Sequence, residues 1–216
     1  MKRYRRAGLL ILTLAIPALI LIFLKGFTTN HYVLPYFNPI LDDQGRVVRR
    51  GDDTLFSSRE QLMVDALDSS GLLSIPLKNR FTVVGFLPKD CDDRCTLYLE
   101  GLQRIYKLRQ AVPTLSLVTL TDGAELLKVG NTYGMGSDGW SLYGLDTSDS
   151  TRAISRELNI YKNAAGTKTN YSFSRLLLLD SEGYTRGYYD FNDAEEVDRL
   201  MAEIRILDYE LKHRNN

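Results

Sequence analysis

Apolar segments and an amphipathic segment alternate in the middle of the chain. Residues 81–87 (FTVVGFL) and 115–120 (LSLVTL) are short apolar runs with many β-branched side chains, as is typical of buried strands. Between them, residues 96–110 carry apolar side chains at helical spacing, and Pro113 follows where such a helix would end. This pattern predicts a buried strand, a helix and a second buried strand in succession.

The C-terminal part of the chain predicts a hairpin and a closing helix. Residues 175–179 (RLLLL) and 184–191 flank the turn sequence DSEG, and residues 193–211 follow as a helix capped by Asn192 or Asp193. Further elements are expected as a short helix or turn over 57–66, a hairpin over 67–75, helices over 124–133 and 150–158, and a short strand over 140–142. This order builds a thioredoxin-like α/β domain, in which a mixed central sheet has helices on both faces.

The start of the chain combines a basic segment with a long apolar run. Four of residues 1–6 are Lys or Arg, and residues 7–24 then contain no charge. As a helix this run would reach roughly 27 Å, which is close to the thickness of the hydrocarbon core of a bilayer. The run is longer than the apolar core of a signal peptide, and no small-x-small cleavage site follows it. We therefore expect one uncleaved transmembrane helix, with a cleavable signal peptide as the alternative.

The charges beside the apolar run predict where the rest of the chain lies. Lys25 is the one basic residue directly beyond the run, so residues 1–6 are expected in the cytoplasm. The protein would then be a single-pass protein of the inner (cytoplasmic) membrane with its C-terminal domain on the periplasmic side, where a dithiol can persist as a disulfide. Residues 25–56 are interpreted as a stalk, either a plain tether or an extended strap on the domain, and residues 57–216 as the thioredoxin-like domain.

The overall charge and the histidines exclude several functions. The 27 basic and 27 acidic side chains give a formal net charge of zero, so no global field favours nucleic acid as a partner. The histidines, His31 and His213, stand where no Ser-His-acid arrangement can be recognised. The glycine-rich residues 130–139 lack the strand–helix context and the lysine of a phosphate-binding loop.

The two cysteines, Cys91 and Cys95, lie in the sequence DCDDRC between the first predicted strand and its helix. Residues four apart in a helix have α-carbons about 6 Å apart, inside the ~4.4–6.8 Å range of disulfides. The helix N-terminus, Lys89 and Arg94 favour the thiolate, whereas the three acids of the motif oppose it. The residues alone leave three interpretations open: a redox-active dithiol, a copper(I) ligand pair, and a structural disulfide.

A copper site would need more than the two cysteines if it is trigonal. Copper(I) is soft and binds thiolates readily, and two sulfurs suffice for a linear or bent site. Met135 and His31 are the candidates for a third donor, and zinc is disfavoured because four nitrogen or sulfur ligands are not at hand. Asp122, at the end of the second strand, is a candidate for tuning the thiols, and Trp140 is expected in the core.

Five features together resemble the Sco/SenC family of membrane-anchored, thioredoxin-like proteins, which handle copper and thiols during cytochrome oxidase assembly. They are the apolar run, the GLLSI hairpin, FTVVGFLPKDCDDRC with its C-x-x-x-C, the strand LSLVTLTDG, and GWSLYG followed by a helix and LNIY. The resemblance covers residues 67–206. Asp92 departs from it, because the family has proline there, and KTNYSFSRLLLL lacks the histidine that supplies the family's third copper ligand.

The resemblance implies a function for the cysteine pair. Cys91 would attack and Cys95 would resolve during thiol–disulfide exchange in the maturation of a metalloprotein such as cytochrome oxidase. The partners would be the membrane and a client metalloprotein or a thiol-redox protein. One alternative is a copper(I) chaperone with Cys91 and Cys95 as metal ligands, which makes copper the one cofactor implied. The other is a non-catalytic binding module with a vestigial or structural disulfide.

Overall fold

The computed structural model describes residues 13, 15–22, 33–65, 72–87, 93–121, 133–136, 138–145, 154, 158 and 175–214, with the side chains of 65, 72, 93–95 and 214 left out. The chain forms two compact units, Met1–Val33 and Leu34–Asn216. In the first unit, residues 15–22 are helical. Within the described residues no helix has both the length and the apolar character needed to cross a membrane. The anchor expected over residues 7–24 therefore stays a prediction.

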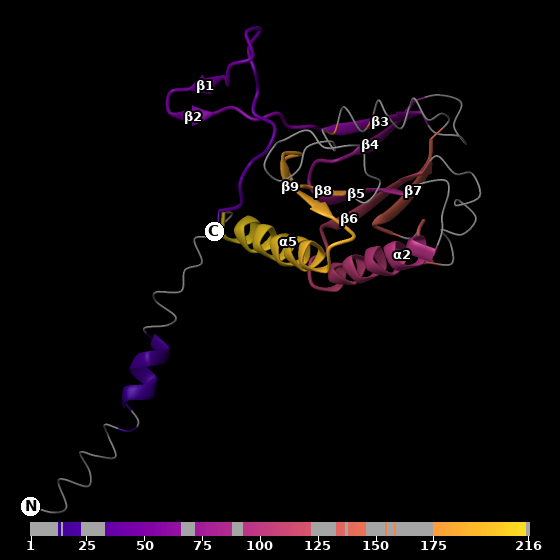
Figure 1. Ribbon diagram of the computed structural model, residues 1–216. Helices are drawn as coiled ribbons and strands as arrows, with labels where there is room; N and C mark the ends of the chain where they lie inside the picture. Colours follow the sequence, from indigo (N-terminus) through magenta and orange to yellow (C-terminus); the bar gives the residue numbers. More distant parts are fainter. Residues whose placement is uncertain are drawn as a thin grey trace, which may run out of the picture. The chain divides into compact units, whose positions relative to one another are not determined.

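Five strands form the central sheet of the unit Leu34–Asn216, in the order β7-β6-β5-β8-β9 (Figure 1). Their bounds are Phe81–Leu87 for β5, Leu115–Thr121 for β6, Trp140–Gly144 for β7, Arg175–Leu179 for β8 and Thr185–Asp190 for β9. β5, β6 and β7 are parallel, whereas β8 runs antiparallel to β5 and to β9. The mixed sheet and the β8–β9 hairpin confirm the predictions for these segments.

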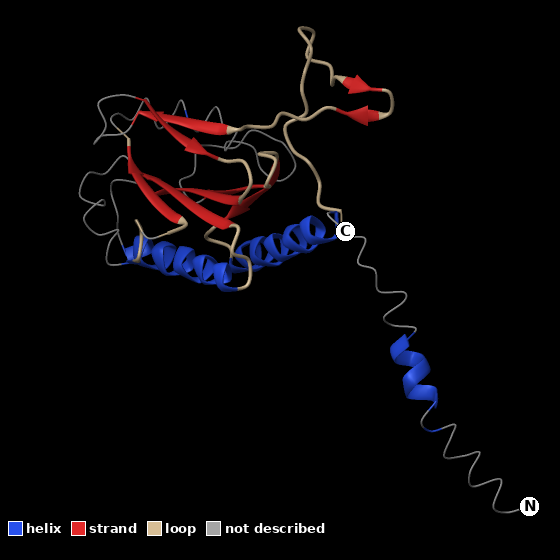
Figure 2. Cartoon of the chain, turned by 180° about the vertical axis from the view of Figure 1, so that it is seen from behind, coloured by secondary structure: helices blue, strands red, loops and turns tan. Residues whose placement is uncertain are grey.

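The two long helices lie on one face of this sheet. α2 spans Asp93–Tyr106 and continues as the 3₁₀ helix η1, Lys107–Gln110, and α5 spans Ala194–Arg214. Figures 1 and 2 show α2 and α5 on the same side of the sheet, with the hairpin of β3 (Gln61–Asp65) and β4 (Leu72–Pro76) on the other side. Ile154 and Leu158 pack with β3 and β4 on that second face. The helices expected over 124–133 and 150–158 otherwise lie outside the described residues.

Two hydrophobic cores result, one on each face of the sheet. Along β5, Phe81 and Val83 belong to the core beneath α2 and α5, whereas Val84 and Phe86 belong to the core beneath the β3–β4 hairpin. Successive side chains of a strand point to opposite faces, so a strand covered on both faces is apolar throughout. All seven residues of β5 are accordingly buried.

The expected helix or turn over residues 57–66 is wrong for 61–65, which form β3. The physical reason is the period of two in this segment. Leu62 and Val64 are fully buried, whereas Gln61 and Met63 face solvent. A helix would have placed Leu62 and Val64 on different faces, and the strand lets both of them reach the second core.

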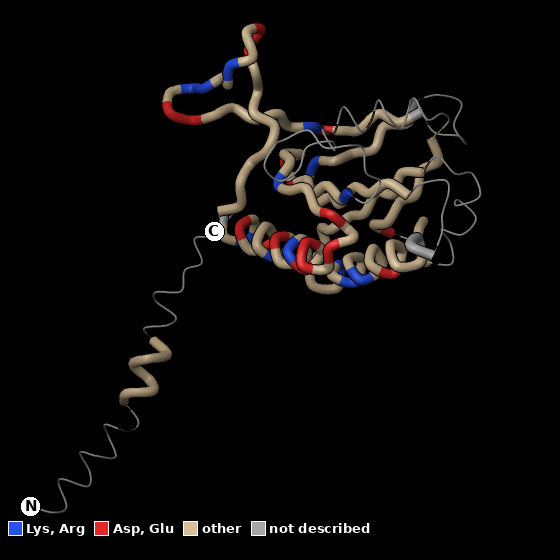
Figure 3. The backbone as a smooth tube through the Cα atoms, in the orientation of Figure 1, with Lys and Arg blue, Asp and Glu red and all other residues tan. Residues whose placement is uncertain are grey.

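The residues before β3 form a strap and a small arm. Residues 34–38, here called the strap, belong to the same compact unit as the domain, although residues 25–56 were expected to be a stalk. Residues 39–57, the arm, contain the strands β1 (Arg49–Arg50) and β2 (Asp53–Thr54), and bridges join Pro39 to Phe56 and Leu41 to Val47. Basic and acidic positions both occur along the arm (Figure 3).

Candidate functional site

The candidate site is the junction between β5 and α2. β5 ends at Leu87 and α2 begins at Asp93, so Cys95 is the third residue of the helix. The backbone of Cys95 thus lies in the first turn, where the sequence predicted it. Cys91 and the thiol group of Cys95 lie outside the described residues and side chains, as does Asp122. The N-terminus of a helix carries a partial positive charge, which stabilises a thiolate in its first turn.

The junction lies at the edge of the sheet where α/β proteins carry their chemistry. β5 and β6 are parallel, and their last residues, Leu87 and Thr121, are paired with each other. The carboxyl ends of these two parallel strands therefore meet at the edge of the sheet where β5 leads into the junction. In open α/β sheets, ligands bind beyond these carboxyl ends.

Tyr98 fills the space one helical turn beyond Cys95. Its side chain is buried against β5, and a Cβ atom added to Gly85 would collide with the Tyr98 hydroxyl. Burial raises the pKa of Tyr98, and the nearby backbone of Phe86 offsets this only in part. None of the described residues makes a well-aligned hydrogen bond with this hydroxyl. Gly85 is therefore needed for packing, because α2 can approach β5 only where β5 lacks a side chain. The sequence showed Gly85 only as an interruption of an apolar run.

His213, which was not among the candidates for a third copper ligand, lies far from the junction. His213 is on the last turn of α5, where its Nδ1 is 2.8 Å from the carbonyl oxygen of Tyr209 and its ring stacks on the Tyr209 ring at 3.8 Å. In Figures 1 and 2 this end of α5 and the first turn of α2 are at opposite sides of the domain. Met135 is buried in the first core, and His31 lies outside the described residues.

Both cysteine thiols and His31, three of the four candidate donors for copper, lie outside the described residues and side chains. Among the described residues no three His, Cys, Asp or Glu side chains are grouped so as to hold a metal ion. Met135 is a core residue, as is Trp140, whose Nε1 donates a hydrogen bond of 3.0 Å to Thr119 Oγ1. We therefore derive no step through copper.

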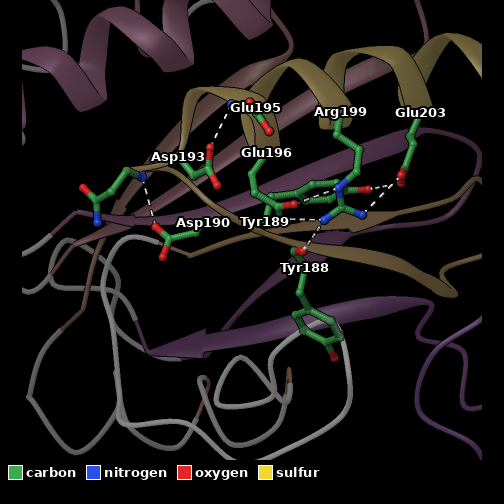
Figure 4. A network of polar contacts seen from close by, with 9 residues as sticks. Tyr188, Tyr189, Asp190, Asp193, Glu195, Glu196, Arg199 and Glu203 are labelled. Atoms are coloured by element: carbon green, nitrogen blue, oxygen red, sulfur yellow. Dashed lines mark hydrogen bonds and ion pairs between the residues drawn. The ribbon is translucent and has the colours of Figure 1, made fainter.

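Away from the junction, a cluster of polar side chains connects α5 to β9 (Figure 4). Arg199 donates to both carboxylate oxygens of Glu196, at 3.0 and 2.6 Å, and to the backbone oxygen of Tyr188 at 3.1 Å. Glu203 accepts a hydrogen bond from Tyr189 and forms an ion pair with Arg199 at 3.3 Å. Every charged member has a partner within the cluster, so its role is to hold α5 on the sheet. The spacing of Glu196, Arg199 and Glu203 along one helix was the signal in the sequence.

No family model matches the sequence, and no curated protein matches it either. Solved structures match it in three dimensions. A SCO1/SenC family lipoprotein from Bacillus anthracis is 14% identical with a TM-score of 0.54, covering 69% of this chain and 94% of that one. BsSco, a member of the Sco family of cytochrome c oxidase assembly proteins, is 13% identical with a TM-score of 0.55, covering 82% and 98%. A Bacteroides thetaiotaomicron protein proposed to be a protein disulfide isomerase is 14% identical with a TM-score of 0.51, covering 84% and 98%.

These neighbours establish the fold. The chain has a thioredoxin-like α/β fold of the Sco/SenC kind, which confirms the fold predicted from the order of its elements. At such low sequence identity the similarity says nothing by itself about chemistry. The function must be argued from the junction of β5 and α2.

Proposed function

We propose that this protein is a membrane-tethered, extracytoplasmic thiol–disulfide exchange protein that acts through Cys91 and Cys95 on a client metalloprotein such as an oxidase subunit. The observation that carries the proposal is the position of Cys95 in the first turn of α2, directly after the first parallel strand of a thioredoxin-like sheet. The other cysteine precedes it by four residues. A structural neighbour from a family of cytochrome c oxidase assembly proteins supports the class of client.

The exchange proceeds in two steps that balance without a cofactor. The Cys91 thiolate attacks one sulfur of a client disulfide, so that a Cys91–client bond forms, the client disulfide breaks, and the leaving client thiolate takes up a proton. The Cys95 thiolate then attacks the sulfur of Cys91. The second client thiol leaves, the protein keeps a Cys91–Cys95 disulfide, and the client has gained two electrons. The same steps in reverse oxidise the client.

The helix N-terminus gives the two cysteines different tasks. Cys95 lies in the first turn of α2, where the unpaired N–H groups of the helix stabilise its thiolate when the internal disulfide opens. Cys91 precedes the helix and is therefore the cysteine assigned to attack an incoming disulfide. This division of tasks predicts unequal effects of replacing the two residues.

Single replacements test the exchange reaction in the full-length protein in detergent. The Cys95→Ser variant keeps the attacking sulfur and lacks the resolving one. With glutathione disulfide it is expected to accumulate a mixed disulfide at least about tenfold faster than the Cys91→Ser variant, as read by intact mass. Equal rates in the two variants would contradict the proposal. In cells, the protein that Cys95→Ser holds as a mixed disulfide would identify the client.

The copper(I) chaperone remains the competing function, and a separate titration distinguishes it. In that function the two cysteine sulfurs of the reduced protein would bind copper(I) in a linear or bent site. The protein and its Cys91→Ser variant are titrated against a copper(I) chelator. Tight binding that is lost in the variant would favour the chaperone. A protein that neither binds copper(I) nor exchanges disulfides would favour the interpretation as a non-catalytic binding module.

A further inference from the structure

The arm, residues 39–57, is hydrogen-bonded within itself but has no core of its own. The main-chain N–H of Ile40 donates to the carbonyl oxygen of Leu55 at 2.9 Å, and the Ile40 carbonyl oxygen accepts from the N–H of Val48 at 2.8 Å. All residues of the arm are described, and none of them is buried. A small hairpin that packs on no other element is only marginally stable in water. Burial against a second surface would therefore stabilise the arm.

The base of the arm is fastened to the turn between β8 and β9. The ring of Tyr36, in the strap, lies 5.4 Å from the rings of both Phe56 and Tyr184, measured between ring centres. Beyond the arm, the N–H of Arg59 donates to the carbonyl oxygen of Gly183 at 3.0 Å. Gly183 has a φ of +83°, and a Cβ atom there would collide with the Arg59 carbonyl oxygen. Both ends of the arm are thus fixed on the domain, so a partner that binds the arm orders few further residues.

The strands β1 and β2 place one basic and one acidic side chain on the same face of their hairpin. Arg50 is paired with Asp53, and Arg49 is paired with Thr54. Residues opposite each other in an antiparallel pair share a face, whereas neighbours along a strand point to opposite faces. Arg50 and Asp53 therefore share one face, and Arg49 points to the other. The three charged side chains are exposed, and none of them forms an ion pair with another described residue.

An apolar pair continues this face away from the turn. The N–H of Leu55 donates to the carbonyl oxygen of Val48 at 3.1 Å, so the pairing of β1 with β2 extends to these two residues. By the same alternation, Val48 and Leu55 point to the side of Arg50 and Asp53. Both are only partly buried. We call the surface formed by these four residues the Arg50–Asp53 face.

The Arg50–Asp53 face is complementary to itself. A two-fold axis along the hairpin lays β2 of a second copy over β1, so that Arg50 faces Asp53 of the second copy and Val48 faces its Leu55. In a two-fold contact each of these pairs occurs twice. Pairing through the strand edges would instead align β1 with β1 or β2 with β2, and like charges would then lie opposite each other.

We infer that the arm joins two copies of this chain, with the Arg50–Asp53 face of one copy packed on the same face of the other. A partner of a single charge sign would be attracted by one of these residues and repelled by the other. A second copy supplies both signs in reversed positions. Because the charged pairs are exposed, the contact is weak and is screened by salt. The inference is independent of the dithiol and of the proposed function.

Sedimentation equilibrium of the full-length protein, in a detergent of matched density, measures this association. The protein is expected to form dimers at low salt and to dissociate as salt is raised. Arg50→Asp and Asp53→Arg each place like charges opposite one another twice, so each variant is expected to associate at least about tenfold more weakly. A protein that stays monomeric at low salt would overturn the inference. So would dimers that both variants leave intact, because another segment would then form them.

Restored association tests whether Arg50 and Asp53 face each other across the two copies. An equimolar mixture of Arg50→Asp and Asp53→Arg pairs opposite charges again, and so does the double variant with itself. Both are expected to regain an affinity within about threefold of the original. Unfolding midpoints in urea equal to that of the original protein show that the variants are folded, as expected for exposed positions. Folded variants that stay monomeric in both cases would overturn the inference.

Arg49→Asp is the matched control. It changes the net charge by the same amount as Arg50→Asp, and residue 49 points to the other face of the hairpin. It is expected to weaken the association less than about twofold at a salt concentration where the Debye length is about 8 Å. A loss as large as that of Arg50→Asp would show that net charge governs the association, and it would overturn the assignment of the contact to the Arg50–Asp53 face.

Discussion

At the scale of single residues, Arg186 connects several separate segments. It joins β9 to the strap and to Asp180, whose other carboxylate oxygen accepts from the main-chain N–H groups of Glu182 and Tyr184 at 3.0 Å. Replacing Arg186 by Met keeps the aliphatic volume and leaves the Asp180 carboxylate buried without its cation. We expect the free energy of unfolding to fall by about 3 kcal/mol, measured by urea denaturation.

A double variant serves as the control for Arg186. Asp180→Asn removes the charge that the Arg186→Met variant leaves unpaired and keeps an oxygen for the turn. The double variant is therefore expected to be more stable than Arg186→Met alone. If the unfolding free energies of Arg186→Met and the original protein differ by less than about 0.5 kcal/mol, the contacts of Arg186 with Asp180 and the strap contribute nothing to stability.

Gly85 and Tyr98 form the second residue-scale test. A methyl group at position 85 would collide with the Tyr98 hydroxyl and lie 3.0 Å from a methyl group of Leu176. Gly85→Ala is expected to cost about 2 kcal/mol of unfolding free energy through overpacking. Tyr98→Phe removes a buried hydroxyl without a well-aligned partner, so on its own it should be neutral or slightly stabilising. In the double variant most of the Gly85→Ala cost should disappear; strictly additive urea-unfolding values would refute the contact.

Three buried tyrosines predict how stability depends on alkaline pH. Burial raises the pKa of Tyr98, Tyr188 and Tyr189, and for Tyr189 the neighbouring Glu203 adds to the effect. Above pH 10 the unfolded chain loses these protons while the folded protein keeps them. The contribution of these tyrosines to the unfolding free energy should therefore be constant below pH 10 and fall above it by about 1.4 kcal/mol per pH unit for each tyrosine. In Tyr98→Phe, the decrease of the unfolding free energy above pH 10 should be less steep by the contribution of one tyrosine. An equally steep decrease would show that Tyr98 does not have a raised pKa.

Single residues differ in how far the sequence reveals them. The C-x-x-x-C spacing predicted the cysteine pair at the junction, and Trp140 was expected in the core, where it lies. Met135 was considered as a copper ligand, and the structure places it in the first core. The hydrogen bond from Arg186 to the main-chain oxygen of Leu34 was not predictable, because the two residues are 152 positions apart in the sequence and meet only in the folded domain. Tyr188 and Tyr189 are both buried, although neighbouring residues of a strand point to opposite faces of the sheet. Both faces are covered here, which a local pattern does not reveal.

At the scale of elements, the start of α5 settles an open choice between two caps. The Asp193 carboxylate accepts from the main-chain N–H of Glu195 at 2.9 Å, which is the contact of an N-terminal cap. Asp193→Ala is expected to lower the unfolding free energy by about 1 kcal/mol. Asn192→Ala is the matched control and should have little effect in the same urea titration. If Asn192→Ala lowered the unfolding free energy more than Asp193→Ala does, the cap of α5 would be Asn192 and this assignment would be wrong.

Strands and helices were predictable where one period dominated. β5, β6, β8 and β9 follow the apolar runs closely, and α5 follows its helical stripe. β3 was missed because Leu62, Met63 and Val64 are only a three-residue apolar run in a polar neighbourhood. The burial of Leu62 and Val64 depends on pairing with β4 and on the second core, and these are tertiary effects that override a short local signal.

At the scale of the whole molecule, the order of elements was sufficient to predict a mixed thioredoxin-like sheet, because connection rules leave few alternatives. The assignment of residues 34–56 was harder. The strap contributes Leu34 to a core and a main-chain hydrogen bond to β9, yet its five residues are too few to show a helix or strand period, and Pro35 interrupts them as in a free linker. The copper question also belongs at this scale, since His213 and the junction are brought to opposite sides only by the fold.

The central claim is that Cys91 and Cys95 form one exchangeable disulfide, and a redox titration tests it most directly. The reduced full-length protein is equilibrated in glutathione buffers of graded oxidation, its free thiols are alkylated, and its intact mass is measured. The account predicts a single transition in which both thiols disappear together and an internal disulfide forms, with no such species in Cys91→Ser. Thiols that stay free, or that end only as separate glutathione adducts, across the whole series would contradict it.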